Sequence, residues 1–124
     1  MKKSELNILI VEDEIIASQY LLNILESLGF INIFEASSFE EALEIVKSNK
    51  IHLSFMDINI NGSIDGINSA RLLNKEYSLP IIFTTAYGDS QTINEATDTN
   101  IFAYLVDPEK VNISNKLLNF SRNN

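Results

Sequence analysis

Three acidic residues stand where apolar runs of the sequence end. Glu12 and Asp13 follow the run 6–11, and Asp57 follows the run 51–56. An acid at the carboxyl end of a buried strand is where open α/β sheets place their ligand chemistry. Taken alone, Asp57 has an alternative role as a turn-starting or helix-capping residue. The rest of the sequence has to decide between these two roles.

Three carboxylates in one crevice repel one another, because the dielectric there is lower than in water. A divalent cation among them removes this repulsion, and an all-oxygen ligand set favours Mg2+ or Mn2+ over zinc. Such a site suits phosphoryl transfer, which needs a nucleophile, a metal and donors for the phosphoryl oxygens. Asp57 is the candidate nucleophile, because an ionised carboxylate needs no general base. Thr85 is a candidate hydroxyl donor to the phosphoryl group.

Composition limits the classes of protein to which the chain can belong. Its 124 residues suffice for one domain with one core, and no linker or repeat divides residues 1–124. The absence of cysteine excludes disulfides and thiolate chemistry, and the formal net charge of −8 argues against a nucleic-acid partner. No apolar run is long enough for a membrane span or a signal peptide, so we expect a cytoplasmic protein. The single histidine, His52, is expected to be structural.

Apolar runs alternate with apolar residues at helical spacing along the chain. Runs rich in Ile, Val and Phe predict strands at 6–11, 31–36, 51–56, 81–84 and 102–106. Helical spacing predicts helices at 15–28, after residue 38, at 67–77, at about 90–98 and from about 111. The alternation predicts a parallel sheet with helices on both faces and right-handed connections.

Two of these helices carry informative details. The apolar residues of the first helix are Ile15, Ile16, Tyr20, Leu21, Ile24, Leu25 and Leu28, and Gly29 follows as a stop. Ser37 with Glu40 and Ser38 with Glu41 form two overlapping capping boxes before the second helix. By contrast, the helix at 90–98 has few apolar residues, which predicts weak anchoring to the sheet.

The carboxyl ends of parallel strands meet at one edge of a sheet, and that edge is expected to collect the polar residues. They are Glu12, Asp13, Asp57, Thr84, Thr85 and Asp107. For Thr84 the favoured interpretation is an ordinary strand residue.

Four segments together resemble the receiver domain of two-component response regulators. They are the acidic strand end 8–14, the segment 56–66 around Asp57, the segment 80–86 and the segment 104–108. The resemblance covers nearly the whole chain. It implies a flavodoxin-like (βα)5 fold, with a doubly wound five-stranded parallel sheet in the order 2-1-3-4-5.

The resemblance assigns roles around the metal. Asp57 would be the phosphoacceptor, and Asp13 would bind Mg2+ directly. Glu12 would act partly through water, and the backbone carbonyl of Asn59 would be a further ligand.

It also assigns residues that respond to phosphorylation. Thr85 would be the switch hydroxyl and Tyr104 the aromatic switch residue; a core aromatic is the alternative for Tyr104. Asn59 and Tyr87 occupy positions that tune the lifetime of the phosphoryl group. Pro108 would follow a cis peptide bond, which only X-Pro makes at low cost.

One position departs from the family pattern. Receiver domains carry a lysine just before this proline, where its ammonium contacts the phosphoryl group, but this chain has Asp107. Lys110 lies three residues later and is interpreted as a solvated residue, with a contact to the site as the alternative.

Two functions of different classes follow. In the first, the chain is a phosphoreceiver that takes a phosphoryl group from a histidine kinase or a phosphotransfer protein onto Asp57. It would act as an enzyme only in its own phosphorylation and autodephosphorylation, and would signal as a monomer or weak dimer through the helix 4–strand 5–helix 5 face. In the second, favoured by Asp107, it is a pseudo-receiver that binds a partner without phosphorylation. A metal-dependent phosphatase is disfavoured, because Asn59 stands where a second acid is needed.

Overall fold

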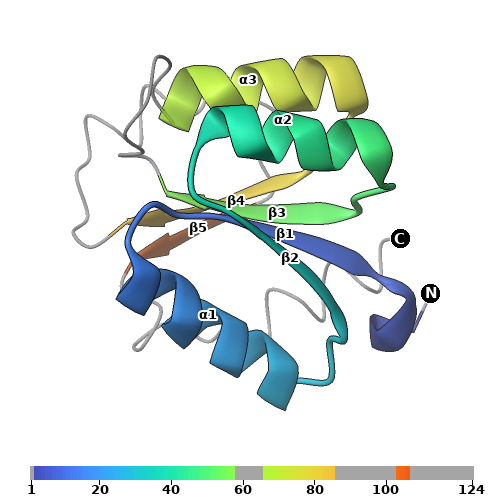
Figure 1. The fold of residues 1–124 in the computed structure, drawn as a ribbon, viewed down its shortest axis with the longest axis vertical. Coiled ribbons are helices and arrows are strands. Elements are labelled where there is room, and N and C mark those ends of the chain that lie inside the picture. The colour runs from blue at the N-terminus through green and yellow to red at the C-terminus, as the bar shows by residue number, and fades with distance from the viewer. Residues whose placement is uncertain (1, 58–65, 86–102, 107–124) are drawn as a thin grey trace.

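The computed structural model describes residues 2–57, 66–85 and 103–106, and these residues build a five-stranded sheet with helices on both sides (Figure 1). The strands are β1 (Asn7–Val11), β2 (Asn32–Ala36), β3 (Leu53–Asp57), β4 (Ile81–Thr85) and β5 (Ala103–Val106). The helices are α1 (Ile15–Ser27), α2 (Phe39–Ser48) and α3 (Gly66–Tyr77), and a short 3-10 helix, η1 (Lys3–Glu5), precedes β1.

The strand order is β2-β1-β3-β4-β5, and every neighbouring pair is parallel. The expected flavodoxin-like sheet is therefore confirmed. Its register aligns the carboxyl ends, since Val11 pairs with both Ala36 and Met56, and Asp57 pairs with Thr84. The change of direction between β1 and β3 is the place where sheets of this kind bind ligands.

The two faces of the sheet have separate cores. Figure 1 shows α2 and α3 on one face and α1 on the other. Alternate residues of the strands serve the two sides: Leu9 and Met56 belong to the core under α2 and α3, while Ile8 and Phe55 pack with Leu25 of α1. The strand residues of both cores are at most about 2% exposed, so the central strands are held from both sides.

The start of α2 follows the capping pattern of the sequence. Ser38 is the N-cap, and its Oγ accepts a hydrogen bond from the backbone N–H of Glu41 at 3.2 Å. The carboxylate of Glu41 reaches back to Ser37, where it accepts from the backbone N–H at 3.3 Å and from the hydroxyl group. Of the predicted pairs, Ser38 and Glu41 thus make the capping contact, and the Glu41 carboxylate bonds to Ser37 instead of to the N-cap residue. Together these bonds fix the turn between β2 and α2.

In α1 the predicted apolar face is only partly buried. Leu21 and Leu25 are buried, but Ile15 and Ile16 at the start of the helix are 84% and 85% exposed. The reason is position: the first turn of α1 lies at the carboxyl edge of the sheet, beyond the strand residues that Leu21 and Leu25 cover (Figure 1). The sequence correctly predicted the position of the helix, but the predicted apolar face included residues that are exposed to water.

Several strand ends also differ from the prediction. Ile31 is 71% exposed and precedes β2, and β3 begins at Leu53 rather than at residue 51. β3 includes Asp57 as its last residue, and β4 includes Thr85. The helix predicted at 90–98, the final helix and the cis bond before Pro108 lie outside the described residues.

His52 has the structural role that was predicted. Its ring Nδ1 accepts a hydrogen bond from the backbone N–H of Asn7 at 3.0 Å, and the backbone N–H of His52 donates to the Asn7 carbonyl at 2.9 Å. The Asn7 side chain adds a third bond, to the Lys50 carbonyl at 2.6 Å. These bonds join the start of β1 to the segment before β3 at the amino edge of the sheet.

Candidate metal centre

Three carboxylates meet at the carboxyl edge of the sheet. Glu12 and Asp13 follow β1 directly, and the backbone N–H of Glu12 donates to the Ala36 carbonyl at 2.9 Å, which extends the β1–β2 pairing by one residue. Asp57 ends the neighbouring strand β3. Each acid therefore takes its position from a strand that is buried on both faces.

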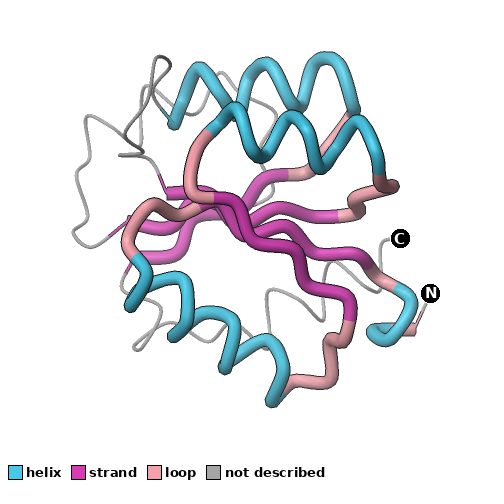
Figure 2. Tube along the Cα trace, in the orientation of Figure 1, coloured by secondary structure: helices cyan, strands magenta, loops and turns pink. Residues whose placement is uncertain are grey.

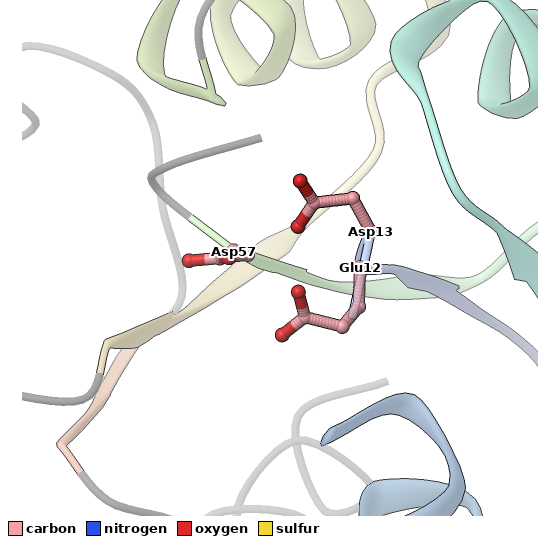
Figure 3. Close-up of side chains that lie close together, drawn as sticks. All are labelled: Glu12, Asp13 and Asp57. Carbon is pink, nitrogen blue, oxygen red and sulfur yellow. The ribbon is translucent and has the colours of Figure 1, made fainter. Parts of the chain in front are cut away.

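The three side chains reach toward the same space. Each offers a carboxylate oxygen, and these oxygens lie within 4.8 Å of one another. Figure 3 shows the carboxylates extending beyond the strand ends, Asp57 from one strand and Glu12 and Asp13 from the other. All three are partly buried, so they are reached from solvent but are only partly screened by it.

Crowding changes the ionisation of Glu12. Burial, and after it the negative charge of Asp57, raise the pKa of its carboxyl group from 4.5 to about 8. The backbone N–H of Glu14, which donates to Glu12 Oε2 at 3.2 Å, opposes this rise. Without a cation, Glu12 thus holds a proton at neutral pH, and the cluster carries less negative charge than three separate acids.

The donor set fits a hard divalent cation. All three side chains offer oxygen, and the part of the chain that the structure describes holds no cysteine thiolate or imidazole in this cluster. Mg2+ is bound by one or two carboxylates together with waters and a phosphate oxygen. A cation here would compete with the Glu12 proton, because both relieve the same repulsion.

The sequence prediction also named residues beyond these three acids. Thr84 pairs with Asp57 across β3 and β4, and Thr85 pairs with Val106. Tyr104 pairs with Phe83. The backbone thus brings Thr85 to the carboxyl edge, whereas the side chains of Thr85 and Tyr104 are not described. Asn59, Tyr87, Asp107 and Lys110 lie outside the described residues.

A hollow beside the acids was not anticipated. It lies between α1, the end of β2 and the start of α2, has a volume of about 320 Å³, and is lined in part by Glu12 and Asp13. Glu35 and Glu41 add two further acids to its wall. Glu35, the charged residue of the predicted strand 31–36, was the available signal in the sequence.

Fold and site together define a doubly wound α/β domain with an acidic cluster between β1 and β3, where the strand order changes direction. The sequence family model named response regulator receiver domain matches residues 8–117 of this chain. Since this match covers most of the chain, the protein belongs to the receiver domain family of two-component response regulators.

Individual relatives agree with this assignment. The transcriptional regulatory protein PdtaR of Mycobacterium tuberculosis is 32% identical over 101 residues, which are 82% of this chain and 49% of PdtaR. The transcriptional regulatory protein YvrH of Bacillus subtilis is 38% identical over 80 residues, 64% of this chain and 33% of YvrH. The chain therefore spans about a third to a half of these curated relatives.

Solved structures agree as well. A two-component response regulator from Clostridium difficile superposes with a TM-score of 0.80 at 27% identity, covering 95% of this chain and 94% of that one. The signal receiver domain of a modulated diguanylate cyclase from Desulfovibrio desulfuricans gives 0.79 at 32% identity, with coverages of 94% and 90%. Within the described residues, no helix has the length and apolar character needed to cross a membrane.

Proposed function

We propose that the chain is a phosphoreceiver, in which Asp57 accepts a phosphoryl group from a histidine kinase or a phosphotransfer protein. One observation carries this proposal: Asp57 ends a buried strand with its carboxylate among two further acids, and the three oxygens lie within 4.8 Å. A carboxylate held this way is a nucleophile beside a cation site, as phosphoryl transfer requires. Membership of the receiver family supports the same function.

In this reaction the Asp57 carboxylate attacks the phosphorus atom of a phosphohistidine. The new bond joins a carboxylate oxygen to phosphorus, the phosphorus–nitrogen bond breaks, and the leaving imidazole nitrogen takes up a proton. Mg2+, held by Asp13 and Asp57 with Glu12 acting partly through water and the Asn59 carbonyl as a further ligand, would neutralise the charge on the phosphoryl oxygens.

Before phosphorylation, the sheet keeps the nucleophile Asp57 close to Glu12 and Asp13. Both follow β1, the strand paired with β3, so their distance from Asp57 is set by the sheet rather than by a loop. A protonated Glu12 does not add to the negative charge around Asp57. Loss of this proton, which the raised pKa of about 8 places near neutral pH, prepares the cluster for the cation.

The effect of phosphorylation would then be transmitted through β4 and β5. Thr85 ends β4, and Tyr104 lies on the neighbouring β5, which is where the family resemblance expects the switch hydroxyl and the aromatic switch residue. We propose that they respond to the phosphoryl group and alter the helix 4–strand 5–helix 5 face for a downstream protein. We further propose that the domain works in the cytoplasm as a monomer or weak dimer.

The decisive experiment is labelling with acetyl phosphate in millimolar Mg2+, followed by intact mass. The parent chain should gain one phosphoryl mass, and Asp57→Asn should gain none. Glu14→Gln is the matched control, because Glu14 is an exposed neighbour outside the acidic cluster. Labelling of the Asp57→Asn chain at the yield of the parent would overturn the assignment.

A pseudo-receiver, which binds its partner without phosphorylation, is the second candidate, and Asp107 is the residue that favours it. An acid in place of the usual lysine changes the charge beside the phosphoryl group by two units, from +1 to −1. Unit charges at ~4 Å interact by about 4 kcal/mol at an effective dielectric near 20, and rotation into solvent reduces this cost. We therefore expect slow labelling that needs more Mg2+.

Asp107→Lys separates the two candidates. Under the phosphoreceiver proposal, this variant labels faster than the parent chain and binds Mg2+ more weakly, since an acid has been replaced by a cation. Phosphate-induced chemical shifts at Thr85 and Tyr104 should also grow. If neither chain is labelled, the pseudo-receiver function is favoured; equal rates in both would mean that Asp107 points away from the site.

A further inference from the structure

The strand β2 forms one edge of the sheet, and only its inner side is paired. That side pairs in parallel with β1, and no strand among the described residues pairs with its outer side. Figure 1 shows β2 with α2 on one side of it and α1 on the other. An open strand edge presents backbone N–H and C=O groups that a further strand can bond. The outer side of β2 is therefore a place where the sheet can be extended.

The hydrogen bonding between β1 and β2 tells which backbone groups face outward. Ala36 of β2 bonds to the β1 side, because its carbonyl accepts the backbone N–H of Glu12 at 2.9 Å. In a parallel ladder, residues that bond to one neighbouring strand alternate with residues whose backbone groups point away from it. The backbone groups of Ile33 and Glu35 therefore point outward. Ile31 comes two positions earlier, and we name these three residues the β2 edge.

The polar side chains of β2 do not guard this edge. Edge strands are commonly protected by charged side chains that obstruct a second strand. Glu35 is the one charged residue of β2, and its carboxylate accepts a hydrogen bond from Ser18 Oγ of α1 at 2.9 Å. The Asn32 side chain donates to the Ser4 carbonyl at 3.1 Å. The other residues along the edge are apolar and at least partly exposed: Ile31, Ile33 and Phe34.

The sequence of the β2 edge is complementary to a second copy of itself. Two copies related by a two-fold axis pair the same strand in antiparallel orientation. With Ile33 opposite Ile33 of the second copy, Ile31 lies opposite Glu35 of the second copy, and the outward backbone groups meet as hydrogen-bonded pairs. The two Glu35 residues are then four positions apart, about 13 Å along the strands, which exceeds the screening length of ~8 Å at physiological ionic strength.

We propose that two copies of this chain associate through the β2 edge and form one continuous sheet. The antiparallel pairing points the carboxyl edges of the two sheets in opposite directions, so the acidic clusters of the two copies stay apart. A contact made by one short strand belongs to the small interfaces, below about 1,200 Å², that form weak and transient pairs. The proposal thus gives the weak dimer an interface. It leaves β5 at the opposite edge of the sheet and does not require phosphorylation of Asp57.

The test is amide hydrogen exchange of the isotope-labelled full chain at micromolar and at millimolar concentration. The amides of Ile33 and Glu35 should exchange more slowly at the higher concentration. Those of Phe34 and Ala36, which face β1, should be protected equally at both concentrations. Sedimentation equilibrium measures the dimer itself. Added salt should strengthen the dimer, because two copies with a net charge of −8 repel each other less when screened.

Two substitutions at Ile31 test the register, and the 71% exposure of this residue leaves the fold undisturbed. Ile31→Glu should weaken the dimer about tenfold, because it puts an acid opposite Glu35 at both symmetric positions, and Ile31→Lys should strengthen it by a similar factor. Leu72→Glu is the control with the same change of charge. Leu72 is 38% exposed on α3, which packs on β3, so this variant should leave the dimer unchanged.

Three outcomes would overturn the proposal: a chain that stays monomeric at millimolar concentration, a dimer that protects Phe34 as much as Ile33, or equal weakening by Ile31→Glu and Leu72→Glu. A peptide of alternating valine and lysine provides a further check. If it protects Ile33 and Glu35 while the chain alone stays monomeric, the occupant is a strand of another protein instead of a second copy. No phosphodonor is present, so a failure here is distinct from a failure to label Asp57.

Discussion

The two edges of the sheet treat polar groups in opposite ways. At the amino edge, the groups of Asn7 and His52 pair with each other, and the Asn7 amide pairs with the Lys50 carbonyl. At the carboxyl edge, the carboxylates of Glu12, Asp13 and Asp57 are brought within 4.8 Å of one another. The strands β1 and β3 therefore have hydrogen-bonded polar groups at their amino ends and mutually repelling carboxylates at their carboxyl ends. The comparison shows that the sheet itself holds the acids together against their repulsion.

Changes of pH act on the two edges with opposite sign. Glu12 has a raised pKa in the fold, so its contribution to stability is present below its unfolded pKa of 4.5 and is lost as the pH rises toward 8. Burial, with the nearby Lys50 charge as a second cause, lowers the pKa of His52. Its contribution is therefore present above the unfolded value of 6.5 and is lost as the pH falls below it. The two pH ranges overlap between 4.5 and 6.5, so substitutions at Glu12 and at His52 separate the two contributions.

The largest expected effect is stabilisation of the carboxyl edge by metal. A cation that binds only the folded state raises the unfolding free energy by about 2.7 kcal/mol at roughly a hundred times its Kd. Thermal melts with and without millimolar Mg2+ measure this rise. Asp13→Asn should shrink the shift, while Glu14→Gln, outside the cluster, should keep it. A melting temperature of the parent that ignores Mg2+ would contradict the metal site.

A smaller effect is expected from removing the titrating acid itself. In the absence of metal, Glu12→Gln should be more stable than the parent near pH 8 and equal to it below pH 4.5, because the parent must ionise a buried carboxyl group between these values. Urea unfolding at several pH values checks this. In Mg2+ the advantage should shrink or reverse, since a ligand has been removed. A parent chain whose metal-free stability is flat from pH 5 to 8 would refute this account of Glu12.

The smallest effect is expected at the amino edge. His52→Ala removes the acceptor of the Asn7 N–H bond and should cost about 1 kcal/mol at pH 8, the usual net value of one hydrogen bond. His52→Asn is the matched variant, because its side-chain oxygen can take the place of Nδ1. It should lose less stability than His52→Ala and should no longer weaken as the pH falls from 7 to 5. Identical acid sensitivity of the parent and His52→Asn would assign that sensitivity to another group.

Much of the fold and the centre of the site could be predicted from the sequence. Strong β-formers in short runs can bury both faces only in a parallel sheet covered by helices, and such a sheet aligns its carboxyl ends. Glu12, Asp13 and Asp57 follow or end such runs, so their meeting was a consequence of the pattern. The capping residues Ser37 and Ser38 likewise act locally, within one turn of helix α2. Whether Asp57 is phosphorylated remains a prediction of that pattern and of the family.

Only the tertiary structure decided how far each helix overhangs the sheet and which groups face one another across it. Ile15 and Ile16 have the same residue type as the buried Ile8 and Ile10. They are nevertheless exposed, because the first turn of α1 lies in space beyond the strand residues that the rest of the helix covers. The raised pKa of Glu12 depends on the burial of its carboxyl group and on the nearby charge of Asp57, which is 45 residues away along the chain. The hollow between α1 and α2 has the same origin, since its four acids come from three separate segments. Helical period and strand propensity are local properties, whereas exposure, electrostatic coupling and cavities arise from distances between segments that only packing sets.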